Sequence, residues 1–273
     1  MKKYLSTIIL ILVFVTGLSL LLYPSVSDYW NSFHQSRAIA TYAGEVANLS
    51  NADYGRMWEE ARAYNRRLAE MANPLLSEPA DTADYEALLD IAGSGVMGYI
   101  EIPSIKVSLP IYHGVDEAVL QVAVGHIPGT SLPVGGEGTH SVLSGHRGLP
   151  SAKLFTNLDR LVEGDVFLLR VLNETLTYEV DQILIVEPQE LAALEIEEGR
   201  DYCTLVTCTP YGINTHRLLV RGHRVANAEE AVQIRVTADA IQIEPVLVAP
   251  LVAVPMLLIL LAALLVSTRK KRR

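Results

Sequence analysis

Cysteine is scarce in this chain of 273 residues, which contains only Cys203 and Cys208. Both belong to one segment whose composition predicts a single β-strand. At about 3.3 Å per residue their Cα atoms would be about 16 Å apart, with the side chains on opposite faces. A disulfide needs Cα atoms within about 7 Å of each other. The spacing therefore excludes an internal disulfide, and both thiols are expected to be free.

The chain also lacks the spacings of a metal site. Its two cysteines and seven histidines form no CxxC or HxxxH pattern, and patterns of this kind are typical of zinc ligands. The sequence has no internal repeat and no low-complexity tract either. We therefore predict neither a metal nor another cofactor.

Acidic residues are absent from both ends of the chain. All 31 Asp and Glu lie between residues 24 and 245, together with 15 of the 22 Lys and Arg, so this middle part has a net charge of 15 − 31 = −16. Nucleic acid is a polyanion and binds basic surfaces, so it is excluded as a partner. The middle part should favour a cationic partner, although at physiological salt this attraction reaches only about 8 Å.

Two long runs of the chain, residues 5–23 and 246–266, carry no charge. About 20 apolar residues span the core of a bilayer, so both runs are candidate transmembrane helices. Two lysines precede the first run, and a basic tail at 267–273 follows the second. The excess of Lys and Arg on cytoplasmic segments then places both termini in the cytoplasm and residues 24–245 outside the plasma membrane.

The N-terminal part, residues 1–23, has a second interpretation. Ser25-Val26-Ser27 has the small-x-small form of a signal-peptide cleavage site, so the run could be removed after export. An uncharged stretch of this length is longer than a usual signal core, which favours a retained anchor. The middle part lies outside the membrane in either case.

The exported part begins with a predicted helical segment at residues 24–73. Asn73-Pro74 ends it, because the residue before a proline disfavours helix. Residues 74–90 form a polar, proline-containing loop that ends in a short predicted helix at 85–91. A juxtamembrane linker is expected at 229–245, before the second span.

Residues 91–228 have the sequence pattern of a β domain. Short apolar stretches separated by Gly, Pro and Asp predict a β-barrel or sandwich. Only 154–161 and 190–194 are expected to form helical turns inside this domain. The candidate strands cover residues 96–102, 107–112, 141–144, 166–172, 176–180, 183–186, 202–208 and 218–224.

The last two candidate strands predict a hairpin that contains candidate catalytic residues. Pro210, Gly212 and Asn214 lie between them and are turn residues. A turn centred near residues 212 and 213 sets Cys208 opposite Arg217, and cross-strand neighbours lie about 5 Å apart. A cation at that distance can favour a thiolate or hold an oxyanion, and an acyl-transfer site needs both. Arg221 shares the face of Arg217 but is expected to be structural.

A cysteine nucleophile needs an acid–base partner, which is usually histidine. His146 is the leading candidate, because Ser144-Gly145-His146-Arg147-Gly148 follows a predicted strand and brackets the ring with glycines. His126 and His140 remain alternatives, as does His113 beside a predicted turn. The remaining histidines of this domain, His216 and His223, are expected to point away from Cys208 or to lie far from it along the strand.

Several motifs resemble those of one family. Thr204-Leu205-Val206-Thr207-Cys208 is similar to the TLxTC signature of sortases, the membrane-anchored cysteine transpeptidases of Gram-positive bacteria. His146 and Arg217 match the histidine and arginine of that family. The segments at 98–103, 109–114, 129–136 and 214–222, together with the second span, resemble class C, the sortases that assemble pili.

The resemblance implies an eight-stranded β-barrel and a defined reaction. Cys208 would be the nucleophile that attacks the Thr carbonyl of an LPxTG-like sorting signal and forms a thioester. A Lys amine of a pilin subunit would then resolve the thioester and extend a pilus. His146 would act as general acid and base, and Arg217 would stabilise the substrate or the oxyanion.

Different functions fit the residues less well. A sortase that anchors single proteins would use a cell-wall peptidoglycan amine in place of the pilin Lys. A papain-like cysteine hydrolase would need its cysteine early and its histidine late in the chain, which is the reverse of the order here. A non-catalytic scaffold would tolerate substitution of Cys208 and Arg217.

One motif departs from the class C pattern. Members carry a lid with an Asp-Pro-aromatic motif over the cysteine. The nearest match in the predicted lid loop is Glu78-Pro79-Ala80, which lacks the aromatic residue. We therefore expect Cys208 to be accessible to thiol reagents.

Overall fold

The computed structural model describes residues 2–71, 74–76, 84–91, 93–227, 253–258 and 262. Residues 31–229 form one compact unit, and residues 1–30 belong to another. The predicted linker at 229–245, most of the second span and the basic tail lie outside the described residues. Residues 253–258 within that span are helical.

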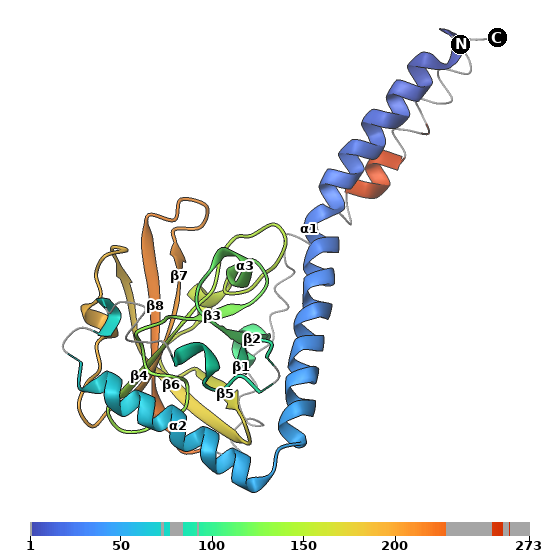
Figure 1. The fold of residues 1–273 in the computed structure, drawn as a ribbon. Helices are drawn as coiled ribbons and strands as arrows, with labels where there is room; N and C mark the ends of the chain where they lie inside the picture. The colour runs from blue at the N-terminus through green and yellow to red at the C-terminus, as the bar shows by residue number, and fades with distance from the viewer. Residues whose placement is uncertain are drawn as a thin grey trace. The chain divides into compact units, whose positions relative to one another are not determined.

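A closed eight-stranded barrel forms the body of the larger unit, which confirms the expected fold (Figure 1). Its strands follow one another around the barrel in the order β1-β2-β3-β4-β7-β8-β6-β5. The strands are β1 (Val96–Ile102), β2 (Val107–His113), β3 (Val124–His126), β4 (Thr139–Ser144), β5 (Val166–Val171), β6 (Glu174–Val186), β7 (Asp201–Thr209) and β8 (His216–Val225).

Two features of the strand prediction were wrong, although the predicted number of strands agrees. β3 was not predicted, because it has three residues and two of them are Gly125 and His126. The strands expected at 176–180 and 183–186 are one strand, β6, whose pairing with β8 shifts register between Val180 and Gln182. The missed strand and the divided strand compensate for each other in the count.

Two helices precede the barrel, α1 (Lys2–Ala47) and α2 (Asn51–Ala69). Most of residues 24–73 are therefore helical, as predicted, but the break between α1 and α2 was not predicted. Ser50 caps α2, because its side chain accepts a hydrogen bond from the Asp53 backbone while the Asp53 carboxylate accepts one from the Ser50 backbone. Such a capping box stabilises a helix start by about 1 kcal/mol.

Both helices are attached to the barrel by buried contacts. The apolar face of α2 is buried at Met57, Trp58, Ala61, Tyr64 and Leu68, a spacing of three and four residues that fits one helical face. The part of α1 after residue 31 contributes Tyr42. Its hydroxyl donates to the carbonyl of Met97 at 3.0 Å and accepts from the amide of Leu172 at 2.8 Å.

Short helices occupy several connections. The expected helical turns at 85–91, 154–161 and 190–194 are present as single 3₁₀ turns within those ranges. The short helix α3 was not predicted. These elements are η1 (Pro74–Leu76), η3 (Tyr85–Ala87), η4 (Pro103–Ile105), α3 (Glu117–Leu120), η5 (Leu158–Arg160) and η6 (Ala192–Leu194).

Within α1, the stretch Thr7–Ala47 is long and apolar enough to cross a membrane, and its most apolar part is exposed. Length and composition are the evidence for this, and a signal sequence near an N-terminus meets the same criteria. The N-terminal run is therefore a possible membrane anchor, as predicted.

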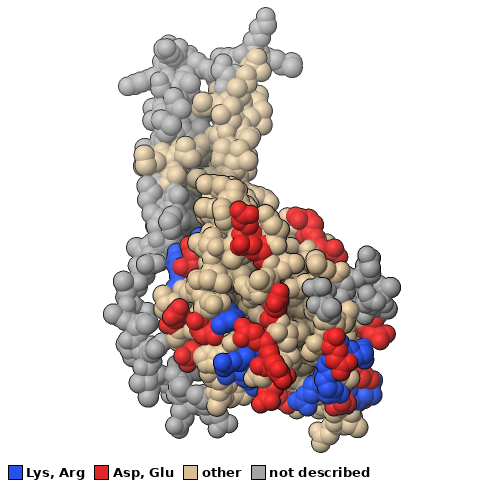
Figure 2. All heavy atoms as spheres, turned by 90° about the vertical axis from the view of Figure 1, so that its left-hand side faces the viewer, with Lys and Arg blue, Asp and Glu red and all other residues tan. Residues whose placement is uncertain are grey.

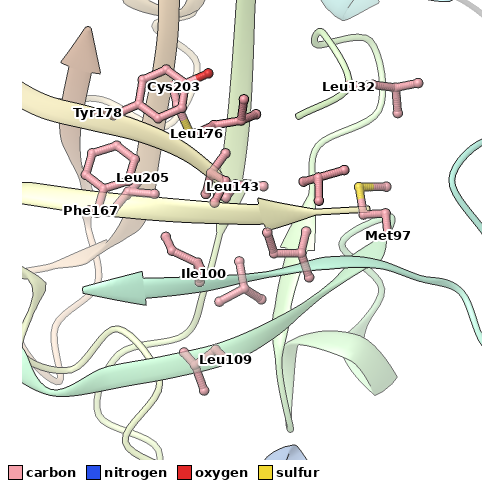
Figure 3. Packing of buried hydrophobic residues seen from close by; sticks show 14 of the residues in the cluster. Met97, Ile100, Leu109, Leu132, Leu143, Phe167, Leu176, Tyr178, Cys203 and Leu205 are labelled. Carbon is pink, nitrogen blue, oxygen red and sulfur yellow. The ribbon is translucent and has the colours of Figure 1, made fainter. Parts of the chain in front are cut away.

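The barrel interior is filled by apolar side chains (Figure 3). Phe167 stacks on Tyr178 with ring centroids 5.5 Å apart, and Cys203 is completely buried among these residues. Burial raises the pKa of the Cys203 thiol well above its usual value. Cys203 is therefore an inert core residue, and both cysteines are free, as the sequence predicts.

Strand β7 has a second face, outside the barrel. Because side chains alternate along a strand, Thr204, Val206 and Cys208 point away from the interior that Cys203 and Leu205 fill. A smaller buried cluster, which we call the outer strip, covers this face. It consists of Val142 from β4, Leu194 from η6, Val206 from β7 and Leu219 from β8.

Candidate active site

The β7–β8 hairpin pairs Cys208 with Arg217, as its sequence predicts. The turn residues explain this register. Gly212 and Asn214 have φ values of +74° and +62°, in the left-handed region that Gly and Asn tolerate best. The amides of Ile213 and Asn214 both donate to the carbonyl of Pro210, at 3.1 and 3.0 Å. The compact turn therefore fixes which residues lie opposite each other.

Arg217 has unused hydrogen-bonding capacity. Its Nη1 donates to the backbone carbonyls of Asn214 and His216, at 3.4 and 3.2 Å. Within the part of the chain that the structure describes, no carboxylate forms an ion pair with it. A guanidinium has five N–H donors, so Arg217 can still donate to an anionic or carbonyl oxygen beside Cys208.

His146 is brought to the same end of β7 by a parallel pair of strands. β4 pairs with β7 so that Ser144 is level with Val206, and the ladder continues when the Gly145 amide donates to the Val206 carbonyl at 3.0 Å. The Thr207 hydroxyl donates to the Gly145 carbonyl at 2.7 Å. The paired residues of β4 end at Ser144, and extending this register to the loop that follows predicts His146 near the level of Cys208.

Gly145 is required for this approach. A Cβ atom at this position would lie 2.7 Å from the ring of Phe155, closer than real contacts allow. The amide of Phe155 also donates to the carbonyl of His146 at 3.1 Å. The His146 backbone is thus held on both sides, while its side chain remains 28% exposed.

His126 and His140, which the sequence leaves open as acid–base partners, are buried with both ring nitrogens engaged. In His126, Nδ1 lies 2.8 Å from the Tyr85 hydroxyl and Nε2 lies 2.8 Å from the Ser131 carbonyl. Burial lowers the pKa of His126 to about 4. His140 has Nε2 2.7 Å from the Thr204 hydroxyl, and burial lowers its pKa as well. Neither ring is free to exchange a proton with a substrate at Cys208.

His113 and His216 also have partners away from the cysteine. His113 has one ring nitrogen 3.0 Å from the carbonyl of Gly95 and the second 2.7 Å from that of Leu88. His216 is opposite Thr209 in the hairpin, and its Nδ1 lies 2.9 Å from the Thr215 hydroxyl. Among the predicted candidates, only His146 comes from a backbone segment that the strand register places level with Cys208.

Arg221 has a structural environment. It forms two hydrogen bonds with the carboxylate of Asp181, at 3.0 and 3.1 Å, and its guanidinium lies 4.1 Å from the ring centroid of Tyr202. His223 lies nearby, 3.9 Å from the same carboxylate. Arg217 and Arg221 share a face of β8, but of the two only Arg217 is paired with Cys208.

Two further charged residues lie at this end of the barrel and were not singled out from the sequence. Arg147 is almost buried, pairs with Asp159, and lies 3.5 Å from the Thr209 hydroxyl. Glu117 of α3 lies 3.8 Å from the Nε2 of His146. Arg147 could have been identified from the sequence, because it directly follows His146. Nothing in the sequence pointed to Glu117, because its proximity to His146 depends on closure of the barrel.

No group of three or more His, Cys, Asp or Glu that could hold a metal ion occurs among the described residues. The components of the site are a thiol, an imidazole and a guanidinium. These groups can carry out acyl transfer through a cysteine nucleophile.

The sortase domain family matches residues 100–225. Sortase C1 from Streptococcus agalactiae is 51% identical, and the match covers 70% of this chain and all of that one, with a TM-score of 0.69. The chain belongs to the sortase family. Sortase C from Streptococcus pneumoniae is 43% identical over 70% of this chain and 97% of its own, with a TM-score of 0.62. Sortase D from Bacillus subtilis is 28% identical over 190 residues, which are 68% of this chain and 92% of that one.

Membership of this family makes the sortase a cysteine transpeptidase and rules out the papain-like hydrolase. The lid motif Glu78-Pro79-Ala80 lies outside the described residues. At the start of the predicted lid loop, η1 packs closely on the Gly129 turn, where a Cβ atom would lie 2.4 Å from the carbonyl oxygen of Pro74. Gly129 also has a positive φ of +82°, so both the turn and the contact require glycine.

Proposed function

We propose that this sortase cleaves an LPxTG-like sorting signal and joins its Thr to a Lys amine of a pilin subunit. The observation that carries the proposal is the pairing of Cys208 with Arg217 on the outer face of β7, at the end of the barrel to which β4 delivers His146. The 51% identity to a sortase C1 supports the class. The related sortase C of Streptococcus pneumoniae has pilin substrates.

In the first half-reaction, the Cys208 thiolate attacks the carbonyl carbon of the signal's Thr. The carbonyl oxygen becomes an oxyanion, to which the unused N–H groups of Arg217 donate hydrogen bonds. The bond from the Thr carbonyl carbon to the Gly nitrogen breaks. His146 gives its proton to the leaving Gly amine, and a thioester between Thr and Cys208 remains.

In the second half-reaction, a Lys amine attacks the thioester carbonyl. His146, now neutral, accepts the proton that the amine must lose, and Arg217 holds the second oxyanion. The carbon–sulfur bond breaks, which restores the thiolate of Cys208. The product is an isopeptide bond between the Thr carboxyl group of one subunit and the Lys of the next.

A cavity near the outer strip offers a place for the apolar residues of the signal. Val206 of the outer strip is two residues from Cys208 on the same face, about 7 Å away. A cavity of about 590 Å³ adjoins this strip, and Leu75, Leu191 and Leu194 contribute to its lining. We assign this cavity, and not the buried strip itself, to the Leu and Pro of the signal, since apolar groups gain from burial in such a site.

The membrane arrangement follows from the chain ends. We propose that α1 and the second apolar run anchor the sortase in the plasma membrane, with both termini in the cytoplasm and the barrel outside. Figure 2 shows Asp and Glu spread over one face of the barrel, with Lys and Arg gathered among them in its lower part.

Mass spectrometry of the product tests the proposal. The full chain in detergent is incubated with a peptide that carries an LPxTG signal and with a pilin domain that supplies a Lys. A Thr–Lys isopeptide is the expected product. A product joined only to a peptidoglycan amine, with the pilin Lys unused, would instead establish the protein-anchoring sortase. Release of free Thr carboxylate alone would overturn transpeptidation to pilin.

A further inference from the structure

We propose that Glu117 is a positioning residue for His146 and stabilises its protonated form during cleavage of the substrate. The inference rests on the proposed acid–base role of His146. Glu117 lies on α3, outside the β7–β8 hairpin and the β4 loop that carry the three reacting groups of the site. Its Oε2 lies 3.8 Å from the Nε2 of His146.

The Glu117 carboxylate is held in place from its opposite side. Its second oxygen accepts a hydrogen bond from the side-chain amide of Gln121, one helical turn later. The Glu117 side chain is 73% exposed and that of His146 is 28% exposed. The two groups therefore meet at the rim of the site, where the ring remains accessible to a substrate.

Backbone packing places Glu117 there. β3 runs antiparallel to β4 with Gly125 level with Ser144, so the residues just before β3 lie beside the His146 loop. α3 leads directly into β3. The preceding loop is pressed onto the sheet, because a Cβ atom on Gly125 would lie 2.2 Å from the Gly114 carbonyl oxygen. The pairing of β3 with β4 thus places Glu117 near His146, whatever rotamer its side chain adopts.

The chemistry explains why a carboxylate is useful there. A free cysteine and a free histidine, with ordinary pKa values of about 8.5 and 6.5, form the thiolate and imidazolium together in only about 1% of molecules at pH 7. A carboxylate close to an imidazole favours the protonated ring. That ring must carry a proton when the Gly amine leaves.

The arginines at this end of the barrel do not provide this effect. Arg217 lies beside Cys208, and Arg147 is paired with Asp159. Both arginines are cations and disfavour a protonated ring. Among the described residues, Glu117 is the carboxylate within ion-pair distance of His146.

The test compares E117Q with D116N in the full-length sortase. Both substitutions remove one negative charge from neighbouring exposed positions, and the Asp116 side chain makes no capping hydrogen bond. The rate of thioester formation with an LPxTG peptide is measured from pH 6 to 9. We expect E117Q to lower kcat/KM about two- to five-fold on the alkaline side of the profile, as for an exposed ion pair.

The dependence on salt concentration is a second readout, because a purely structural role of Glu117 would not depend on salt. At an ionic strength near 1 M the Debye length is about 3 Å, so the difference between wild type and E117Q should largely disappear. D116N should follow the wild type at every pH. Equal losses in E117Q and D116N, or no loss in either, would overturn the proposal.

Two further outcomes separate this proposal from its competitors. If E117Q forms the thioester normally and slows only its resolution by the amine, Glu117 binds the incoming Lys, and positioning of His146 is refuted. C208A and H146A are measured alongside. Thioester formation in C208A, or undiminished cleavage in H146A, would refute the proposed function itself, whatever E117Q does.

Discussion

The two cysteines of this sortase are five residues apart on one strand and have opposite surroundings. Cys203 points into the barrel, where it has no exposed surface, and burial raises its pKa well above the usual value. Cys208 points outward, is partly exposed and lies opposite a guanidinium. The comparison shows that the face of a β-strand, and not the residue type, decides which thiol can react.

The largest predicted effect tests this comparison directly. C208A should abolish thioester formation and isopeptide transfer, because the substitution removes the sulfur that forms the covalent bond. Mass spectrometry of sortase mixed with an LPxTG peptide detects the covalent adduct. A persistent adduct in C208A would refute the assignment of the nucleophile.

C203A is the matched control. It should retain the adduct and lose about 1 kcal/mol of stability in urea unfolding, since it removes one buried sulfur from the core. A thiol reagent should label Cys208 in the native protein and Cys203 only after unfolding. Rapid native labelling of Cys203 would contradict the described difference between the faces.

The second prediction contrasts Arg217 with Arg221, which share a face of β8. R217A should lower the rate of thioester formation about 10²- to 10³-fold, the loss typical of one missing oxyanion donor. R221A should chiefly lower stability, because Arg221 is held by Asp181 and Tyr202. Stopped-flow acylation and urea unfolding of both variants separate the effects. An equal loss of rate in both variants would show that position beside Cys208 is not what matters.

The third prediction concerns a buried histidine, in contrast to the accessible His146. The folded state lowers the pKa of His126 from 6.5 to about 4, so the unfolded chain binds more protons between these values. Stability from this group is complete above pH 6.5 and is lost as the pH falls towards 4. The free energy of unfolding should fall by about 3 kcal/mol over this interval.

Urea unfolding at several pH values measures this effect. H126Q keeps a polar side chain but cannot titrate, so its stability should fall less over the same interval. The difference between the two slopes isolates His126 from the carboxylates. Parallel slopes would show that His126 is not held neutral by burial.

The last prediction concerns the stability contributed by Arg147, which follows His146 and pairs with Asp159. R147M should cost about 2 kcal/mol in stability, because the ion pair with Asp159 is only partly buried. R160M is the control, since Arg160 is exposed. Thermal unfolding compares the two variants. If R160M were as destabilised as R147M, a specific role of the Arg147 ion pair would be excluded.

The hairpin could be predicted in detail because its information is local. Two β-branched stretches and a turn of Pro, Gly and Asn fix the register that sets Cys208 opposite Arg217. The break between α1 and α2 was also readable in principle, since Ser50 and Asp53 have capping-box spacing. It was missed because helical composition continues on both sides.

Features that depend on distant parts of the chain could not be predicted. β3 is too short to show alternation, and it exists because β2 and β4 pair with its two edges. The proximity of Glu117 to His146 results from that same pairing. The glycine-bracketed loop made His146 the leading candidate, and the family resemblance then favoured it over His126 and His140. The burial of those two rings depends on the closed barrel and could not be predicted.

The position of β7 between β4 and β8 has a consequence for how the enzyme is made. Strand β7, which carries the proposed nucleophile Cys208, forms a local hairpin with β8, the last strand of the barrel, and also pairs with β4, which lies far earlier in the chain. The pairing with β4 joins distant segments, and such pairing is slow because loop-closure entropy is lost before the contacts form. During synthesis the chain therefore has no preformed active site, and the site is complete only when the barrel has folded.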